Sequence, residues 1–256
     1  MEPVVLTRAD AGVGTLTLNR PDAMNAITVE LATRLEQGLA ELAGRDDVHV
    51  IVVRGAGGNF CVGGDFKALQ ELRAQGPDAM AGLFEAFGRA TAVIATLDVP
   101  VIAAVEGFAM AGGFELMQAS DIVVVADEAK IADNHSNFGM VPGGGGSQRL
   151  PRLVGRQRAL THILTGDRLR GPDAVAWGLA YRSVPAAELD AVVVDLAAKL
   201  AAKDPRSLAG IKRLVLDGLQ GTLDDGLALE RRAVVDHIAG EAGGAGIASF
   251  TTSRGA

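Results

Sequence analysis

Two pairs of adjacent glycines and one acidic side chain could carry chemistry. Gly63-Gly64 follow Phe60-Cys61-Val62, and Gly112-Gly113 follow Met110-Ala111. Glycine lets the backbone approach a ligand closely, and two backbone N–H groups aimed at one oxygen would stabilise negative charge that develops on it. Glu115 lies three residues after Gly112, where its carboxylate could move a proton. Taken singly, each feature also fits an ordinary turn or an acidic residue in the first turn of a helix.

A run of four glycines, Gly143 to Gly146, has the composition of a phosphate-binding loop. That loop needs Lys and then Ser or Thr after its second glycine, and here Ser147 and Gln148 follow. The dinucleotide pattern Gly-x-Gly-x-x-Gly fails as well, because Thr17 and Phe60 stand where the third glycine is required. We therefore expect neither a nucleoside triphosphate loop nor a dinucleotide-binding fold.

The cysteine and three of the four histidines favour structural roles. His49, His162 and His237 lie far apart in the sequence without acidic partners at the spacing of metal ligands, so no metal site is predicted. Cys61 is close to a glycine pair, but a small buried thiol is its more common role.

Composition excludes several classes of protein. The chain has 256 residues, is 48% hydrophobic and carries a net charge of -7, which suits one large domain and argues against nucleic-acid binding. The most apolar stretch, Val99 to Met117, is interrupted by Glu106 and Glu115, so a membrane span is not expected. A single cysteine and an N-terminus without a signal-peptide pattern favour the cytoplasm.

Strands and helices are expected around these residues. Val4 to Arg8 and Val13 to Leu18 predict a hairpin across a turn at Asp10-Ala11-Gly12. Thr28 can cap a helix from Val29 to Ala43, which has one apolar face formed by Leu31, Leu35, Leu39 and Leu42.

Apolar runs without alternation predict strands that are covered on both faces. Three such runs are Val48 to Val53, Val101 to Val105 and Ile122 to Ala126, and Gly112-Gly113 leads into a predicted helix from Phe114 to Ala119. Strand, glycine-rich turn and helix in this succession indicate an α/β fold.

The rest of the chain is predicted to be largely helical from about residue 157. Three helices are expected at Ala186 to Ala202, Pro205 to Leu219 and Leu223 to Ile238. The tail from Gly240 is rich in Gly, Ala, Ser and Thr, and we expect order there only through contacts with other parts of the molecule.

Taken together, these residues resemble a known family. The segments that carry the resemblance are Asn19-Arg20-Pro21 with Asn25-Ala26, Phe60 to Asp65, Ala104 to Leu116, Gly139 to Leu150, Leu164 to Asp167, and Ala174 with Trp177-Gly178-Leu179. In order and spacing they resemble the crotonase family of enoyl-CoA hydratases and isomerases. The similarity covers nearly the whole chain.

The resemblance implies roles for specific residues. The backbone N–H groups of Gly64 and Gly112 would bind the thioester oxygen, and Glu115 would stand at one catalytic carboxylate position. The acyl-CoA path would be lined by Gly64, Asp65, Phe66, Lys67 and Gly112, with Ala26 near the adenine end. Lys67 could supply positive charge, although a solvated lysine is an equally good reading. Asp22 departs from the basic residue that many relatives have there.

His135 is the informative departure. Counting back from Gly139, hydratases with two catalytic glutamates have the second one where this chain has His135. The ordinary imidazole pKa of about 6.5 suits proton transfer, so we expect Glu115 and His135 to be the acid/base pair. Glu115 would activate water, and His135 as imidazolium would protonate the α carbon.

The resemblance implies a crotonase-like fold of repeated β-β-α units over residues 1–190 and a helical oligomerisation region over residues 191–256. It also implies a homotrimer or homohexamer that acts on acyl-CoA in fatty-acid metabolism, with no separate cofactor because coenzyme A is part of the substrate. The function expected is hydration of a 2-enoyl-CoA, or the reverse. A double-bond isomerase with a single base and a non-catalytic acyl-CoA-binding protein are the alternatives. The stretch from Ala68 to Phe87 is expected to shape the acyl pocket.

Overall fold

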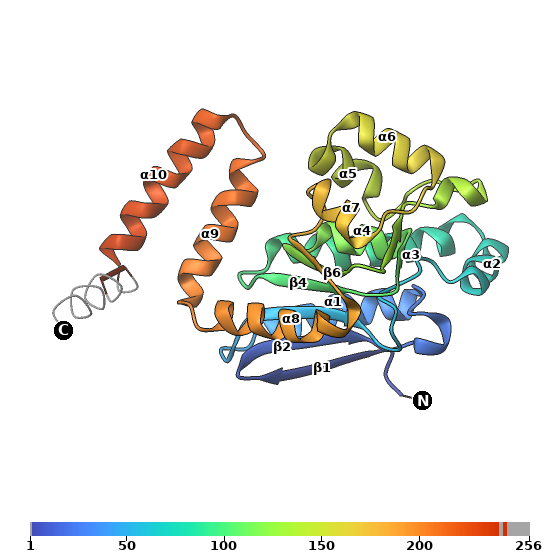
Figure 1. Ribbon diagram of the computed structural model, residues 1–256, viewed down its shortest axis with the longest axis horizontal. Coiled ribbons are helices and arrows are strands. Elements are labelled where there is room, and N and C mark those ends of the chain that lie inside the picture. The colour runs from blue at the N-terminus through green and yellow to red at the C-terminus, as the bar shows by residue number, and fades with distance from the viewer. Residues whose placement is uncertain (1, 241–242, 245–256) are drawn as a thin grey trace.

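A six-stranded sheet is the centre of the computed structural model, which describes residues 2–240 and 243–244 (Figure 1). The strand order is β1-β2-β3-β4-β6-β8. The bounds are β1 (Val5–Asp10), β2 (Gly12–Leu18), β3 (Val48–Gly55), β4 (Val101–Val105), β6 (Ile122–Ala126) and β8 (Arg182–Val184). β1 and β2 form the predicted antiparallel hairpin, and every other neighbouring pair is parallel. The apolar runs predicted as buried strands are therefore the central strands.

A second, two-stranded parallel sheet pairs β5 (Phe108–Met110) with β7 (Lys130–Ala132). An isolated parallel bridge between Cys61 and Ala109 continues this sheet on its other side. β4, β5 and α4 (Gly112–Ala119) thus form one β-β-α unit, and β6, β7 and the segment that follows repeat it. The structure confirms the predicted fold of repeated β-β-α units.

Helices cover both faces of the large sheet. α1 (Val29–Ala43) lies behind the sheet in Figure 1 and α8 (Ala186–Ala201) lies in front of it. The Oγ1 of Thr28 accepts a hydrogen bond from the amide of Leu31 at 3.2 Å, which is the predicted N-cap. α8 buries Leu189, Val193 and Ala197 against the strands.

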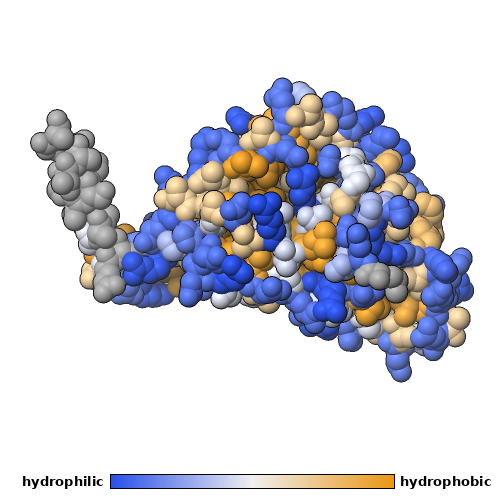
Figure 2. Space-filling view, turned by 90° about the horizontal axis from the view of Figure 1, so that it is seen from below, coloured by the Kyte–Doolittle hydropathy of each residue, from blue (hydrophilic) through white to orange (hydrophobic). Residues whose placement is uncertain are grey.

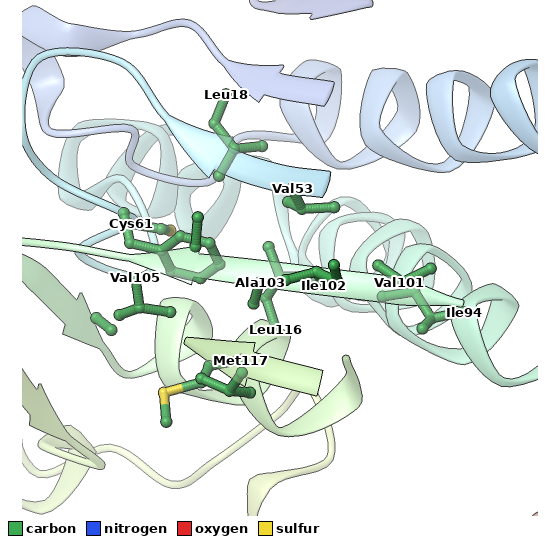
Figure 3. Close-up of a cluster of buried hydrophobic side chains, with 14 of the residues drawn as sticks. Leu18, Val53, Cys61, Ile94, Val101, Ile102, Ala103, Val105, Leu116 and Met117 are labelled. Carbon is green, nitrogen blue, oxygen red and sulfur yellow. The ribbon is translucent and has the colours of Figure 1, made fainter. Parts of the chain in front are cut away.

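The hydrophobic core lies between the strands and the helices of the β-β-α units. Figure 3 shows Leu18 of β2, Val53 of β3, Ile102 of β4 and Leu116 of α4 in this core, together with the thiol of Cys61. All five residues are almost fully buried. The backbone that carries both glycine pairs is therefore anchored in a packed interior, which limits how far either turn can move.

Several elements were not predicted as separate helices or strands. They are α2 (Phe66–Gln75), α3 (Pro77–Thr96), α5 (Gly146–Val154), α6 (Arg156–Thr165), α7 (Gly171–Ala176), the 3-10 helices η1 (Pro21–Ala23) and η2 (His135–Phe138), and the short strands β5, β7 and β8. Gly76, at φ +110°, separates α2 from α3 in a conformation that favours glycine.

Two C-terminal helices, α9 (Pro205–Gly218) and α10 (Leu223–Ala239), pack on each other and project away from the sheet (Figure 1). The domain boundary predicted at residue 190 falls inside α8. The predicted tail lies outside the described residues except at positions 240 and 243–244. No helix within 2–240 is long and apolar enough to cross a membrane.

Candidate active site

A cavity of about 610 Å³ contains most of the residues singled out from the sequence. Gly64, Gly112, Glu115 and His135 all line it. The remaining wall is largely apolar and comes from α2, α3, η2 and the loop after η2, through Phe66, Leu69, Met80, Leu83, Phe84, Phe87, Phe138, Met140 and Val141. An apolar acyl group could lie here with its reacting atoms beside the polar residues.

The two glycine turns lie against each other in the wall of the cavity. A Cβ placed on Gly63 would come within 2.7 Å of the Cβ of Ala111, and one on Gly112 would lie 3.6 Å from the Cα of Gly63. Gly63 has φ +95°, and Ala111 has φ +47°, which is uncommon for alanine. Among the described residues, no acceptor takes the amide N–H of Gly64 or of Gly112. Both amides are free to bind an oxygen of a ligand.

Glu115 is held by the run of four glycines. It lies in the first turn of α4, is 1% exposed, and its Oε1 accepts hydrogen bonds from the amides of Gly144 at 2.7 Å and Gly146 at 2.8 Å. A Cβ on Gly144 would lie 2.7 Å from Oε2 of Glu115 and 2.3 Å from Phe87. The glycine run thus cradles a carboxylate of the protein itself, and only glycine permits the approach.

The protonation of Glu115 reflects a balance between burial and its hydrogen bonds. Burial raises its pKa, while the amide of Gly146, the charge of His135 and the amide of Gly144 lower it, and the charge of Asp133 raises it again. The net direction is upward from the ordinary value of 4.5. A more basic carboxylate is a better acceptor of a proton near neutral pH.

Arg149 of α5 holds the glycine run through a hydrogen bond to its backbone. Its Nη1 donates to the carbonyl of Gly144 at 2.7 Å, and its Nη2 lies 3.4 Å from the hydroxyl of Thr91 on α3. The guanidinium therefore joins α5, α3 and the loop that carries the Glu115 cradle.

His135, at the start of η2, is paired with a buried aspartate. Its Nδ1 lies 2.6 Å from Oδ1 of Asp133, whose side chain is fully buried. Burial lowers the pKa of His135, but the hydrogen bond and charge of Asp133, together with the charge of Glu115, outweigh it, so the pKa lies above 6.5. The imidazolium form therefore persists to higher pH than in a free histidine.

The other residues expected to line the acyl-CoA path lie in different places. Phe66 lines the cavity, whereas Ala26, Asp65 and Lys67 are not among the residues of its wall. The carbonyl of Ala26 accepts a hydrogen bond from Arg20, whose guanidinium also lies 2.8 Å from Asp65. Asp65 caps α2 by accepting from the amides of residues 67 and 68, and Lys67 is exposed on the first turn of that helix.

Two residues that were expected to be structural are buried. Burial raises the pKa of the Cys61 thiol to about 12, which makes the thiolate scarce at neutral pH. His162 on α6 is 2% exposed and its Nε2 accepts from the amide of Asp133 at 3.1 Å. Across residues 2–240 no group of three or more His, Cys, Asp and Glu side chains is placed to hold a metal ion.

Sequence reasoning missed four residues that shape this site: Asp133, Gly144, Gly146 and Arg149. The composition of the glycine run resembles a phosphate-binding loop, which the following residues exclude, and it gives no indication that its amides bind Glu115. The spacing of Asp133 and His135, two residues apart, was a usable signal, because a short turn can bring such side chains into contact.

Comparison with known proteins places the chain among acyl-CoA enzymes. The sequence model of the family described as enoyl-CoA hydratase/isomerase matches residues 8–255. A probable enoyl-CoA hydratase of Mycobacterium tuberculosis is 34% identical over 251 residues, covering 98% of this chain and 95% of that protein. The 1,2-epoxyphenylacetyl-CoA isomerase of Escherichia coli is 33% identical over 232 residues, covering 90% and 88%.

The fold agrees with these sequence matches. The crystal structure of an enoyl-CoA hydratase from Polaromonas sp. JS666 superposes with a TM-score of 0.94 at 32% identity, covering 97% of each chain. The likeness therefore includes the C-terminal helices as well as the sheet.

Proposed function

The chain belongs to the enoyl-CoA hydratase/isomerase family, and we propose that it adds water to a 2-enoyl-CoA thioester or removes water in the reverse direction. Membership makes it an enzyme of the hydratase/isomerase type with a coenzyme A thioester as substrate. Within the family, the choice of hydration rests on the residues of the cavity.

One observation carries this choice: two groups that can exchange protons line the cavity into which the amides of Gly64 and Gly112 are free to donate. Hydration requires one group to take a proton from water and another to deliver a proton to the α carbon. The buried carboxylate of Glu115 suits the first task, and the imidazolium of His135 suits the second. Moving a double bond along the chain requires only one such group.

The reaction can be written with these residues. Glu115 takes a proton from water as the water oxygen bonds to C3, and the electrons of the double bond move onto the thioester oxygen. The amides of Gly64 and Gly112 hold that oxygen and bind it more strongly as an enolate than as a resting carbonyl. His135 then protonates C2, and the proton left on Glu115 returns to His135 through solvent before the next turnover.

The choice between hydration and isomerisation is tested with two substrates. We expect purified enzyme to convert a 2-enoyl-CoA into a 3-hydroxyacyl-CoA, seen by mass spectrometry as the addition of one water. A 3-enoyl-CoA offered alone should react much more slowly. Conversion of the 3-enoyl into the 2-enoyl thioester without any hydroxyacyl product would favour the double-bond isomerase instead.

The role of Glu115 is tested by Glu115→Gln. Glutamine is isosteric and its carbonyl can still accept from Gly144 and Gly146, so the cradle should remain. We expect kcat to fall by about 10²–10⁴-fold, because a general base contributes that much, while acyl-CoA binding measured by calorimetry changes little. Full activity of this variant would remove Glu115 from the mechanism.

A further inference from the structure

Asp133 holds a position that neither the motifs nor the proposed reaction explains. It follows the last residue of β7, its side chain is fully buried, and its Oδ1 lies 2.6 Å from Nδ1 of His135. Burying a carboxylate is costly unless charge and hydrogen bonds compensate it. A buried carboxylate that contacts a residue of the cavity wall therefore indicates a functional role.

The backbone around Asp133 is fixed on three sides. Its own amide donates to Nε2 of His162 at 3.1 Å, and the carbonyl of Ala132 accepts from the amide of Ala111 at 2.9 Å. Ile131 and Leu169 exchange two backbone hydrogen bonds just before it. Ala111 directly precedes Gly112, so the carboxylate and the glycine turn are placed by the same small sheet.

His162 is suited to its supporting task. Burial lowers its pKa, with smaller opposing effects from Asp133 and Asp167, so the ring stays neutral and its Nε2 can accept. The ring also packs edge-on against Phe114, with centroids 5.3 Å apart, and against Trp177 at 5.7 Å. His162 therefore positions Asp133 without competing for its charge.

The hydrogen bond with Asp133 determines which ring nitrogen of His135 can interact with a bound ligand. Nδ1 donates to Oδ1, which leaves Nε2 as the ring nitrogen without this hydrogen bond, and the His135 side chain lines the cavity. Among the described residues, Oδ2 of Asp133 has no hydrogen-bond partner. Within the part of the chain that the structure describes, His135 is thus the side chain that pairs with the carboxylate of Asp133. A protonated ring would compensate the negative charge of this carboxylate.

We propose that Asp133 is a positioning residue, which turns Nε2 of His135 toward the acyl chain and balances the positive charge of the ring. The inference rests on the proposed function, in which His135 delivers the proton to the α carbon. The groups that act on His135 are Asp133 from the end of β7 and Glu115 from α4, and Arg149 on α5 lies on the far side of the Glu115 cradle. Of these three, Asp133 is the one that forms a hydrogen bond with the ring.

The test separates charge from orientation with two variants. Asp133→Asn keeps an acceptor for Nδ1–H but removes the charge, and Asp133→Ala removes both. The readouts are the titration of the His135 ring by NMR, assigned with His135→Gln among the four histidines, and the pH profile of kcat/KM on a 2-enoyl-CoA. The control is Asp127→Asn, a half-buried aspartate that accepts from Ser183 away from the cavity.

For Asp133→Asn we expect the His135 titration and the alkaline limb of the pH profile to move together to lower pH. At the pH optimum of the wild-type enzyme, kcat should fall by about 10²-fold with KM little changed, and Asp133→Ala should lose at least as much. The Asp127→Asn control should behave as wild type in both measurements. Because asparagine is nearly isosteric, this variant keeps the test available if the alanine variant fails to fold.

Two results would overturn the proposal. One is an Asp133→Asn enzyme whose His135 titrates as in wild type, whatever its activity. The other is a loss of activity that is the same at every pH. A different failure belongs to the proposed function: if His135→Gln keeps full hydratase activity, His135 is not the proton donor, even where Asp133 still controls its titration.

Discussion

Glu115 and His135 place opposite demands on pH. In the proposed reaction Glu115 must be ionised and His135 must be protonated. The ionised carboxylate of Glu115 contributes to activity above its pKa, and this contribution is lost as the pH falls through that pKa. The protonated ring of His135 contributes to activity below its pKa, and this contribution is lost as the pH rises through that pKa. Because both pKa values are raised, both limbs should lie at higher pH than the free side chains would give.

We therefore expect a bell-shaped profile of kcat/KM against pH. Its acid limb should lie above 4.5, the ordinary value for glutamate, and its alkaline limb above 6.5, the ordinary value for histidine. Steady-state rates on one 2-enoyl-CoA across buffers of constant ionic strength measure both limbs. A profile that keeps rising through the alkaline range would show that no protonated histidine is needed.

Gly144 tests the carboxylate cradle directly. In Gly144→Ala the new Cβ would approach Oε2 of Glu115 to 2.7 Å and Phe87 to 2.3 Å, so both side chains must move. We expect a loss of at least 10²-fold in kcat/KM, since misplacing a catalytic group by about 1 Å can cost that much. Gly82→Ala is the matched control, because its Cβ would meet nothing within 4 Å. Equal activity of the two variants would mean that the cradle is dispensable.

The residues of the site differ in how readily they can be predicted from the sequence. Glu115, Gly64 and Gly112 could be singled out because each lies in a short motif, and the family resemblance then implied a role for each. The contacts of Glu115 with Gly144 and Gly146 join residues about 30 positions apart, and they depend on how two β-β-α units pack. No local pattern contains that information, so the sequence excludes a phosphate-binding loop at the glycine run but does not predict its contact with Glu115.

At the scale of elements, α9 is fastened to the end of α3 by two adjacent cations. The Nζ of Lys212 donates to the carbonyls of Ile94 at 2.7 Å and Val99 at 3.1 Å and pairs with Asp121 at 2.7 Å. Arg213 donates to the carbonyl of Thr96. Positive groups at a helix C-terminus complement its dipole. Since α3 supplies Phe84 and Phe87 to the cavity wall, α9 supports the wall indirectly.

Removing the charge of Lys212 should lower the stability of the folded protein. Burial raises the pKa of Asp121 and lowers that of Lys212, while their mutual attraction opposes both shifts. Lys212→Met leaves Asp121 buried without its cation, and we expect a loss of about 3–5 kcal/mol in the free energy of unfolding, measured with urea. Adding Asp121→Asn should recover part of the loss, because the uncompensated charge is gone. A stability equal to wild type for Lys212→Met would refute this account.

The elements that the sequence predicted well are those with strong periodicity or continuous apolar runs. α1, α8, α9, α10 and the central strands agree with their predicted ranges to within a few residues. α2 contains no buried residue and ends at Gly76, so it has no complete apolar face to recognise. β5, β7 and β8 have three residues each, which is too short for a pattern to be distinct from a loop.

At the scale of the whole molecule, α9 and α10 carry apolar side chains without cover. Ile211, Val215, Leu219, Leu223, Val235 and Ile238 are each more than half exposed. The face seen from below in Figure 2 is dominated by hydrophilic side chains with apolar patches between them. Each large apolar side chain gains about 1.5–3 kcal/mol when it is fully buried. A projecting helical pair with six of them favours contact with another subunit.

The trimer or hexamer implied by the family resemblance remains a prediction, and these two helices give it a test. We expect light scattering after size exclusion to give three or six times the chain mass of 26.3 kDa. Leu219→Glu with Leu223→Glu should lower that mass, because burying two carboxylates at an apolar contact is unfavourable. Gln220→Glu adds charge beside Leu219 at an exposed polar position and should leave the mass unchanged. If the double variant keeps the wild-type mass, the contact between subunits lies elsewhere, and a wild-type mass of one chain would exclude the oligomer.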